Sequence, residues 1–386
     1  MSLDALRGFD MFWIVGGQQI VHALRQVSQT GFVGFLSEQM DHKPWAGVTF
    51  YDLIFPLFIF IVGASLVFSL GRTMQQSGKA AACRRIIIRS ALLYLIGIFY
   101  SHGLADGWEK VRLVGILQRI AFCYLFTGLI FCSFKLRGMI VICASLILSY
   151  WALMTFVPIR DISLKRASLV RLAAETGTTD RAALFLSATN RVAGRFEDGL
   201  NLAHHFDFQY LPGSKRGRPY YPEGLLSTLP SIATCLLGVF AGLLLQSKTV
   251  PDQKKVALLI AAGVAGVALG FLWGLQFPVI KKIWSSSFVL VAGGYSCLFL
   301  AAFYQLIEIW HWRQWAQPFV WIGMNPITIY LAHNIVDFPD LADRLVGGPV
   351  QAALGVYGGL LNTAVVMGMS FLLAYFLFRK KIFLRV

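Results

Sequence analysis

Runs of about twenty apolar residues, separated by short polar segments, recur along the whole chain. A helix of that length spans the ~30 Å hydrocarbon core of a bilayer, because each residue adds about 1.5 Å of rise. The third run is short and the ninth contains Asn325-Pro326, so these two are expected to be tilted, broken or partly interfacial. The pattern predicts an all-α, polytopic transmembrane helix bundle of about ten spans, at 8–24, 51–71, 86–101, 115–133, 138–157, 225–246, 254–273, 283–307, 318–336 and 354–378.

Composition supports a membrane protein and argues against a soluble enzyme. Hydrophobic residues make up 57% of the 386 residues and charged residues only 14%, whereas about a quarter of a soluble domain is charged. The net charge of +15 does not indicate nucleic-acid binding, because Lys and Arg are concentrated in alternate short loops. One set of loops carries more than twice as many of them as the other, which predicts that both termini are cytoplasmic. We treat residues 1–386 as one domain and the first run as an uncleaved helix.

Residues 158–224 form the one long polar segment between predicted spans. It contains two helical patterns, RASLVRLAAE and DRAALFLS, followed by the Gly/Pro-rich stretch LPGSKRGRPYYPEG. We expect this extracytoplasmic loop, inserted between spans five and six, to cover the bundle as a cap. The six cysteines lie mostly inside apolar runs without a CxxC pair, so no metal site or disulfide framework is predicted.

Polar residues inside predicted spans mark candidate sites, because a charge at the bilayer centre costs on the order of 3 kcal/mol. Asp4 and Arg7 open the first span three residues apart, so they share a helix face. They form either a simple ion pair or a site for the phosphates of a cytosolic ligand. Arg119 either extends its charge towards the interface or pairs inside the bundle with Glu223 or Asp52.

His42 and Asp52 lie at the start of the second span, beside Trp45. A His next to a Trp at this depth is often only an interfacial residue, yet imidazole is also well suited to proton transfer near neutral pH. Asp52 either orients that imidazole or caps the helix. These residues alone do not decide between an enzyme and a transporter.

Six segments, in order, resemble the motifs of the heparan-α-glucosaminide N-acetyltransferase family, within the transmembrane acyltransferases. They are SLDALRGFDMFWI, HKPWAGVTFYDLIFPLFIFIVGASLVFSL with VRLVGILQRIAFCYL, YYPEGLLSTLPSIATCLLGVFAG, KKIWSSSFVLVAGG and IGMNPITIYLAHNIV. The resemblance runs nearly from end to end, and the chain looks like a compact bacterial member. It implies a transferase that moves an acetyl group from cytosolic acetyl-CoA to an amino sugar of the glucosamine type on the extracytoplasmic side of a bacterial inner membrane.

The resemblance also implies roles for particular residues. His42 falls on the catalytic His of the H-x-x-W-x-G motif, and Asp52 matches the Asp of the DL[IV]FP segment that follows. Acceptor binding is expected from Trp45, Arg119, Glu223, Asn325, Gln18 and Gln118, and acetyl-CoA binding from Arg7, Asp4 and His333. The expected partners are acetyl-CoA, an amino sugar or glycan and the lipid bilayer, without nucleic acid or a metal, and a homodimer is left open.

Two departures from the family pattern concern the acceptor. Tyr221 replaces the Asp that usually precedes Pro-Glu-Gly, and Gln18 replaces an Asn in the first span. Two other functions stay open: a transporter of amino sugars or oligosaccharides that uses His42 and Asp52 as a proton relay, and an O-acetyltransferase of an extracytoplasmic glycan.

Overall fold

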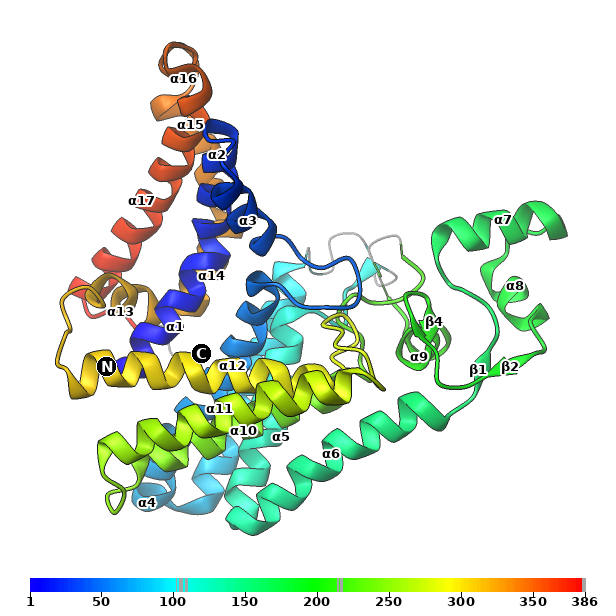
Figure 1. Ribbon diagram of the computed structural model, residues 1–386, viewed down its shortest axis with the longest axis horizontal. Helices are drawn as coiled ribbons and strands as arrows, with labels where there is room; N and C mark the ends of the chain where they lie inside the picture. Colours follow the sequence, from blue (N-terminus) through cyan, green and yellow to red (C-terminus); the bar gives the residue numbers. More distant parts are fainter. Residues whose placement is uncertain (102, 104–106, 108–109, 214, 216–217, 384–386) are drawn as a thin grey trace.

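A computed structural model describes residues 1–101, 103, 107, 110–213, 215 and 218–383. The chain is helical almost throughout, as predicted (Figure 1). Its helices are α1 (Ser2–Phe12), α2 (Gln18–Val27), α3 (Gly31–Gln39), α4 (Phe50–Tyr100), α5 (Ile116–Ser133), α6 (Leu136–Phe156), α7 (Arg166–Thr176), α8 (Arg181–Ser187), α9 (Leu202–Tyr210), α10 (Thr228–Gln246), α11 (Asp252–Gly274), α12 (Ser286–Tyr304), α13 (Gln317–Gly323), α14 (Pro326–Ile335), α15 (Phe338–Val346), α16 (Pro349–Leu354) and α17 (Gly358–Arg379).

Shorter elements complete the described part of the chain. Two π-helical turns, η1 (Trp13–Gly17) and η3 (Gln305–Ile309), continue α1 and α12, and a 3-10 turn, η4 (Gly355–Tyr357), precedes α17. Two antiparallel ribbons of two residues per strand lie in the long loop, pairing β1 (Ile159–Arg160) with β2 (Arg191–Val192) and β3 (Phe196–Glu197) with β4 (Leu200–Asn201). Among the described residues, these ribbons and an isolated parallel bridge between Gly47 and Ile280 depart from an all-α description, and they lie in connecting segments.

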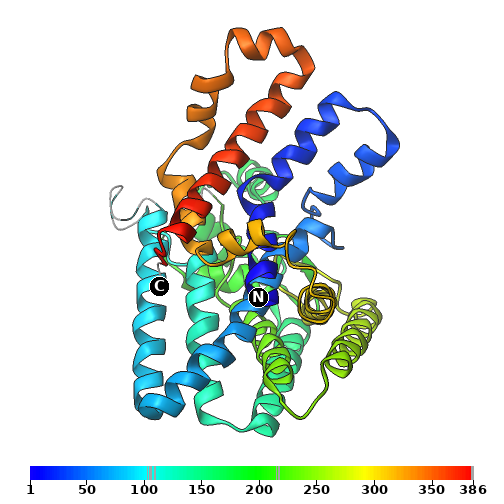
Figure 2. The same ribbon diagram turned by 90° about the vertical axis from the view of Figure 1, so that its left-hand side faces the viewer.

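Seven helical segments within the described residues are long and apolar enough to cross a membrane. The main difference from the ten predicted spans is the position of the breaks between helices. The second and third predicted spans merge into α4, which is helical on both sides of Gly78, where φ is +82° and ψ is 173°. Figure 2 shows the two arms of α4 running in different directions from this point. A tight glycine turn therefore replaces the loop expected after residue 71.

The first and ninth predicted spans are each assembled from shorter helices. The first consists of α1, η1 and α2, with irregular backbone at Gly16. The ninth is broken between α13 and α14 at Met324-Asn325, as the Asn-Pro sequence predicted. The remaining boundaries agree with the prediction to within a few residues.

Small residues allow the central helices to pack closely. A Cβ on Gly238 of α10 would lie 1.9 Å from the carbonyl oxygen of Phe60 in α4, and one on Gly63 would lie 1.9 Å from that of Cys235. Such close backbone approach is the usual way in which helices associate in membranes. By contrast, α6, α11 and α17 expose apolar side chains such as Leu272, as expected for helices that face lipid.

The long loop contains its own small core. Leu164, Leu169 and Phe185 are buried together, and α7 and α8 match the two helical patterns predicted there. Figure 1 shows α7 and α8 beyond the end of α6, whereas α9 lies nearer to the other helices. The role of residues 158–224 as a cap stays a prediction.

Candidate active site

His42 lies in the segment between α3 and α4, and its ring nitrogen Nδ1 is 2.8 Å from Oδ1 of Asp52. The Asp52 side chain is 2% exposed and the His42 side chain 52% exposed. The ring of Tyr51 packs against the imidazole, with ring centroids 5.0 Å apart. The two residues that sequence analysis placed at this helix start therefore form a pair, with the acid buried and the base accessible.

Asp52 is fixed by the way in which α4 begins. It is the third residue of the helix and forms a capping box with Thr49, whose backbone N–H donates to Asp52 Oδ2 over 3.2 Å. The backbone N–H of Lys43 donates to the same oxygen over 3.2 Å. The Thr49 hydroxyl donates to the carbonyl of Asp41 over 2.7 Å. The helix cap thus anchors both ends of the His42 segment to one carboxylate.

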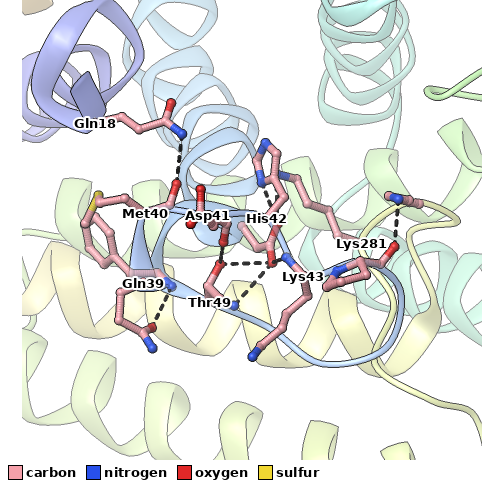
Figure 3. Close-up of polar contacts among 12 residues, drawn as sticks. Gln18, Gln39, Met40, Asp41, His42, Lys43, Thr49 and Lys281 are labelled. Atoms are coloured by element: carbon pink, nitrogen blue, oxygen red, sulfur yellow. Dashed lines mark hydrogen bonds and ion pairs between the residues drawn. The ribbon is translucent and has the colours of Figure 1, made fainter. Parts of the chain in front are cut away.

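Lys281 joins this pair from a distant part of the chain. Its Nζ lies 3.3 Å from Asp52 Oδ1 and 3.2 Å from His42 Nδ1, and Figure 3 shows its side chain beside the His42 ring. Burial lowers the pKa of Lys281, while the charge of Asp52 opposes that change. The backbone N–H of Gly47 donates to the carbonyl of Val279 over 2.9 Å, which holds the two segments together. Sequence analysis did not single out Lys281, although it lies in the quoted KKIWSSS motif.

The short contact with Asp52 favours one tautomer of His42. A carboxylate accepts only, so the short contact assigns a proton to His42 Nδ1, which donates to Asp52 Oδ1. Lys281 then donates to the same carboxylate. In this tautomer of the neutral ring, Nε2 carries the lone pair, and the side chain as a whole is half-exposed. An imidazole oriented in this way can take a proton from a nucleophile or act as one itself.

Trp45 connects the His42 segment to the long loop. Its indole Nε1 donates to the carbonyl of Phe196 over 2.8 Å, and its ring packs edge-on against His204 at 5.6 Å. His204 in turn stacks on Tyr220, with centroids 3.7 Å apart. Lys282 Nζ lies 5.8 Å from the Trp45 ring. These contacts give Trp45 a structural role, and its role in acceptor binding stays a prediction.

Arg119 is buried inside the bundle and does not extend to the interface. Its guanidinium donates to the carbonyl of Gly224 over 3.3 Å and to the Ser227 hydroxyl, and it lies 4.9 Å from the Trp284 ring. Of the two acids proposed as its partners, Glu223 interacts with it electrostatically. Burial confirms that Arg119 lies inside the bundle, while its pairing with Glu223 or Asp52 stays a prediction.

Glu223 has a closer partner that the sequence did not suggest. Arg112 forms an ion pair with its carboxylate, and Arg112 Nε donates to the carbonyl of Val114 over 3.0 Å. Gln118 is 1% exposed and donates to the carbonyl of Arg112 over 3.2 Å. Sequence analysis did not single out Arg112, so it missed the place of this residue beside the candidate acceptor residues.

Three titratable groups in α9 are buried next to this region. Burial raises the pKa of Asp207 to about 7 and lowers that of His205 to about 4. It also lowers the pKa of His204 well below its ordinary value. The Leu225 N–H donates to Asp207 Oδ1 over 3.2 Å, so this acid supports the segment that carries Glu223.

The other candidate residues make hydrogen bonds with parts of the chain other than the His42 side chain. Gln18 Nε2 donates to the carbonyl of Met40 over 2.9 Å, at the end of α3 and two residues before His42. Asn325 is 1% exposed, and its amide donates to the carbonyl of Ile382 over 3.0 Å. His333 contacts the carbonyl of Ile329 and the Ser370 hydroxyl. Ligand contacts of Gln18, Gln118, Asn325 and His333 stay predictions.

A second polar region surrounds the Arg7 side chain of α1. Its guanidinium lies 3.2 Å from Asp4, which confirms the predicted shared face, and donates to the Gly323 carbonyl over 3.0 Å and to Ser65 of α4. Arg89 lies close enough to interact electrostatically with Arg7. Two cations therefore meet where α1, α4 and α13 come together.

Metal ligands form no cluster in the part of the chain that the structure describes. No group of three His, Cys, Asp or Glu side chains there is close enough to hold an ion, and all six cysteines are free. The fold and the site thus define the chain as a polytopic helical membrane protein with a His–Asp pair at one end of its bundle.

Comparison with known proteins shows which family the chain resembles. Residues 1–180 match the model of the family described as heparan-alpha-glucosaminide N-acetyltransferase, catalytic. The mouse (Mus musculus) protein heparan-alpha-glucosaminide N-acetyltransferase is 28% identical over 393 residues, which cover 89% of this chain and 56% of the relative. The human (Homo sapiens) protein of the same name is 29% identical over 386 residues, covering 89% and 55%. The chain spans about half the length of these curated relatives. The resemblance to this family that the motifs predicted is confirmed.

Proposed function

We propose that the protein is a membrane-embedded N-acetyltransferase that moves an acetyl group from acetyl-CoA to the amine of a glucosamine-type sugar. The observation that carries this proposal is the 2.8 Å contact of His42 Nδ1 with the buried Asp52. It orients an accessible imidazole at the start of α4. The names of the mouse and human relatives support the same reaction class.

In the simplest route, His42 Nε2 accepts a proton as the sugar amine attacks the thioester carbonyl. A C–N bond forms, the C–S bond breaks, and the proton passes from His42 to the leaving thiolate. The products are the N-acetylated sugar and coenzyme A, so atoms and charges balance. Asp52 stabilises the intermediate imidazolium, and such general-base catalysis contributes roughly 10²–10⁴-fold.

A second route uses the same nitrogen as a nucleophile. His42 Nε2 attacks the thioester, coenzyme A leaves, and the acetyl-imidazole then transfers its acetyl group to the amine. The two routes differ in one observable. Release of coenzyme A in the absence of an acceptor, at about one equivalent per protein, diagnoses the acetyl-enzyme, whereas the general-base route releases it only with the acceptor present.

The region around Arg7 is the proposed binding site for the donor's phosphates. Arg7 and Arg89 supply two cations there, and guanidinium groups form charge-assisted hydrogen bonds with phosphate. Asp4 fixes the Arg7 side chain. This end of the bundle is proposed to face the cytoplasm, with both termini, in agreement with the excess of Lys and Arg on that side.

The acceptor is proposed to enter from the opposite side, in a bacterial inner membrane, between the His42 segment and the loop 158–224. Trp45 offers an aromatic face to a sugar ring, while Glu223 and Arg119 offer charged groups that bind sugar amines and hydroxyls. Because Tyr221 replaces an acid of the family pattern, the natural acceptor can differ from heparan-type glucosamine.

The direct test measures transfer from labelled acetyl-CoA to glucosamine by purified protein, wild type against His42→Ala. Label on the sugar amine with the wild type alone supports the proposal and the role of His42 together. Equal transfer by a folded His42→Ala protein removes His42 from the mechanism. An ester product identifies an O-acetyltransferase, and uptake of sugar into proteoliposomes without acetyl-CoA identifies a transporter.

A further inference from the structure

Asp10, on α1, is a buried acid that the mechanism above does not use. It is 0% exposed, and neither of its carboxylate oxygens has a hydrogen-bond partner within the described part of the chain. The indole Nε1 of Trp13 is likewise buried without a partner there. The two residues are three apart, so they lie on the same side of the helix. A donor and two acceptors are therefore available side by side in a protected place.

A purely structural role does not account for this pair. A buried hydrogen-bonding group left unsatisfied costs roughly 1–3 kcal/mol, and an unpaired buried carboxylate costs more. A leucine at position 10 would fill similar space without that cost. Trp13 also begins the π-helical turn η1, and such turns are frequent at functional sites. Both features favour a ligand that supplies the missing hydrogen bonds.

The position of the pair suggests which ligand. Arg7, one turn before Asp10, donates to the Ser65 hydroxyl of α4. Asp10 itself lies close enough to interact with Tyr51 of α4, and the Tyr51 ring packs on His42. Tyr51 and Ser65 are 14 residues apart on α4, which corresponds to about 21 Å of helix. The unsatisfied groups thus lie along the α1–α4 contact, between the proposed phosphate site and His42.

We propose that Asp10 and Trp13 bind the amide groups of the donor's pantetheine arm. This inference rests on the proposed function. The arm joins the nucleotide to the thioester and carries two secondary amides, each with one N–H donor and one carbonyl acceptor. The carboxyl oxygens of Asp10 accept from an amide N–H, and the Trp13 indole N–H donates to an amide carbonyl. The arm then lies against α1, and the thioester reaches His42.

Two probes of different composition test this assignment by calorimetry: coenzyme A, and pantetheine, which has the amides but no phosphate. Asp10→Leu should weaken binding of both probes by roughly 10-fold, because a buried hydrogen bond is lost in each complex. Trp13→Phe keeps a ring and removes the N–H, so it should weaken both by roughly 3-fold or more. Asp10→Asn keeps a donor and an acceptor and should bind both nearly as well as the wild type.

Arg7→Leu provides the contrasting result: it should weaken coenzyme A strongly and leave pantetheine unchanged. In transfer assays, Asp10→Leu should raise the KM for acetyl-CoA and leave the KM for the sugar unchanged. Asp180→Asn, an exposed acid at the start of α8, is the matched control for removing a carboxylate and should change neither.

Unchanged pantetheine affinity in Asp10→Leu and Trp13→Phe would overturn the assignment. A rise in the sugar KM alone would also overturn it, since it would make Asp10 an acceptor-binding residue. If Asp10→Leu does not fold, Trp13→Phe and Asp10→Asn still test the assignment. Weaker binding of both probes by Trp13→Phe, together with wild-type affinity in Asp10→Asn, supports the role of Asp10 and Trp13. A wild type that binds neither probe would instead overturn the proposed function, and this inference with it.

Discussion

Asp52→Asn tests whether the buried acid serves His42 or merely caps α4. The change keeps the size of the side chain and one oxygen that can accept from the Thr49 N–H, so the capping box survives in part. It removes the charge and places an amide N–H or oxygen beside His42 Nδ1. An amide N–H there favours the tautomer in which Nδ1 is the acceptor and Nε2 carries the proton, which disables Nε2 as a base.

The magnitude follows from the geometry. Two unit charges about 4 Å apart attract by roughly 4 kcal/mol at an effective dielectric of about 20. His42 is 52% exposed, so solvent screens part of this attraction. Loss of roughly 3 kcal/mol of imidazolium stabilisation lowers kcat by on the order of 10²-fold. The KM for acetyl-CoA should change by less than about 2-fold, because Arg7, and not Asp52, is the proposed phosphate ligand.

The assay is initial-rate acetyl transfer over a grid of donor and acceptor concentrations. Asp41→Asn is the matched control, because this neighbouring acid is 66% exposed and its side chain lies 3.5 Å from His22. It should retain activity within about 2-fold. Asp52→Asn also leaves the Lys281 ammonium without its counter-charge, so adding Lys281→Met should recover thermal stability but not activity. A folded Asp52→Asn protein with kcat within about 3-fold of the wild type would refute the reasoning and reduce Asp52 to a helix cap.

Three further predictions concern stability, measured as the melting temperature in detergent. Gly8→Ala should lower the melting temperature sharply, because a Cβ there would lie 1.6 Å from a backbone oxygen of α13. Gly368→Ala, which has open space around it, should be neutral or stabilising. Equal effects of the two substitutions would contradict this prediction. Arg119→Lys should cost roughly 1–3 kcal/mol, because an ammonium cannot reproduce the contacts of a guanidinium stacked on Trp284; an unchanged melting temperature would count against it. Burial raises the pKa of Asp207 to about 7, so the folded protein keeps a proton that the unfolded chain releases near pH 4. The contribution of Asp207 to stability is therefore complete below about pH 4 and declines as the pH rises to 7. The melting temperature of Asp207→Asn should therefore lack this decline between pH 4 and 7. A variant whose melting temperature follows the same pH profile as the wild type would show that Asp207 does not cause the decline.

Local patterns predicted the features that depend on a few neighbouring residues. Apolar runs predicted most helices to within a few residues, because burial in lipid is set by length and composition. The pairing of His42 with Asp52 was within reach of sequence, since both lie around one helix cap. Breaks were harder to predict. Nothing in the pattern distinguished the single glycine turn at Gly78 from a longer loop, and nothing in it indicated irregular backbone at Gly16 inside the first predicted span.

Contacts between distant segments were not predictable from the same patterns. Arg112 and Glu223 are 111 residues apart, and each alone resembles an ordinary boundary charge. Only the packing of α5 against α10 brings them together. The same packing buries Arg119, which by its position near a helix end looked equally able to reach the interface.

Lys281 shows why these distant contacts matter for the proposed chemistry. It reaches Asp52 because the Gly47 N–H binds the carbonyl of Val279, a backbone contact that no side-chain pattern encodes. That hydrogen bond joins the His42 segment directly to the segment before α12. Any change that shifts residues 279–285 therefore moves the cation beside the His–Asp pair. The charged groups around His42 thus come from two segments far apart in sequence, and Asp52 is the point at which they meet.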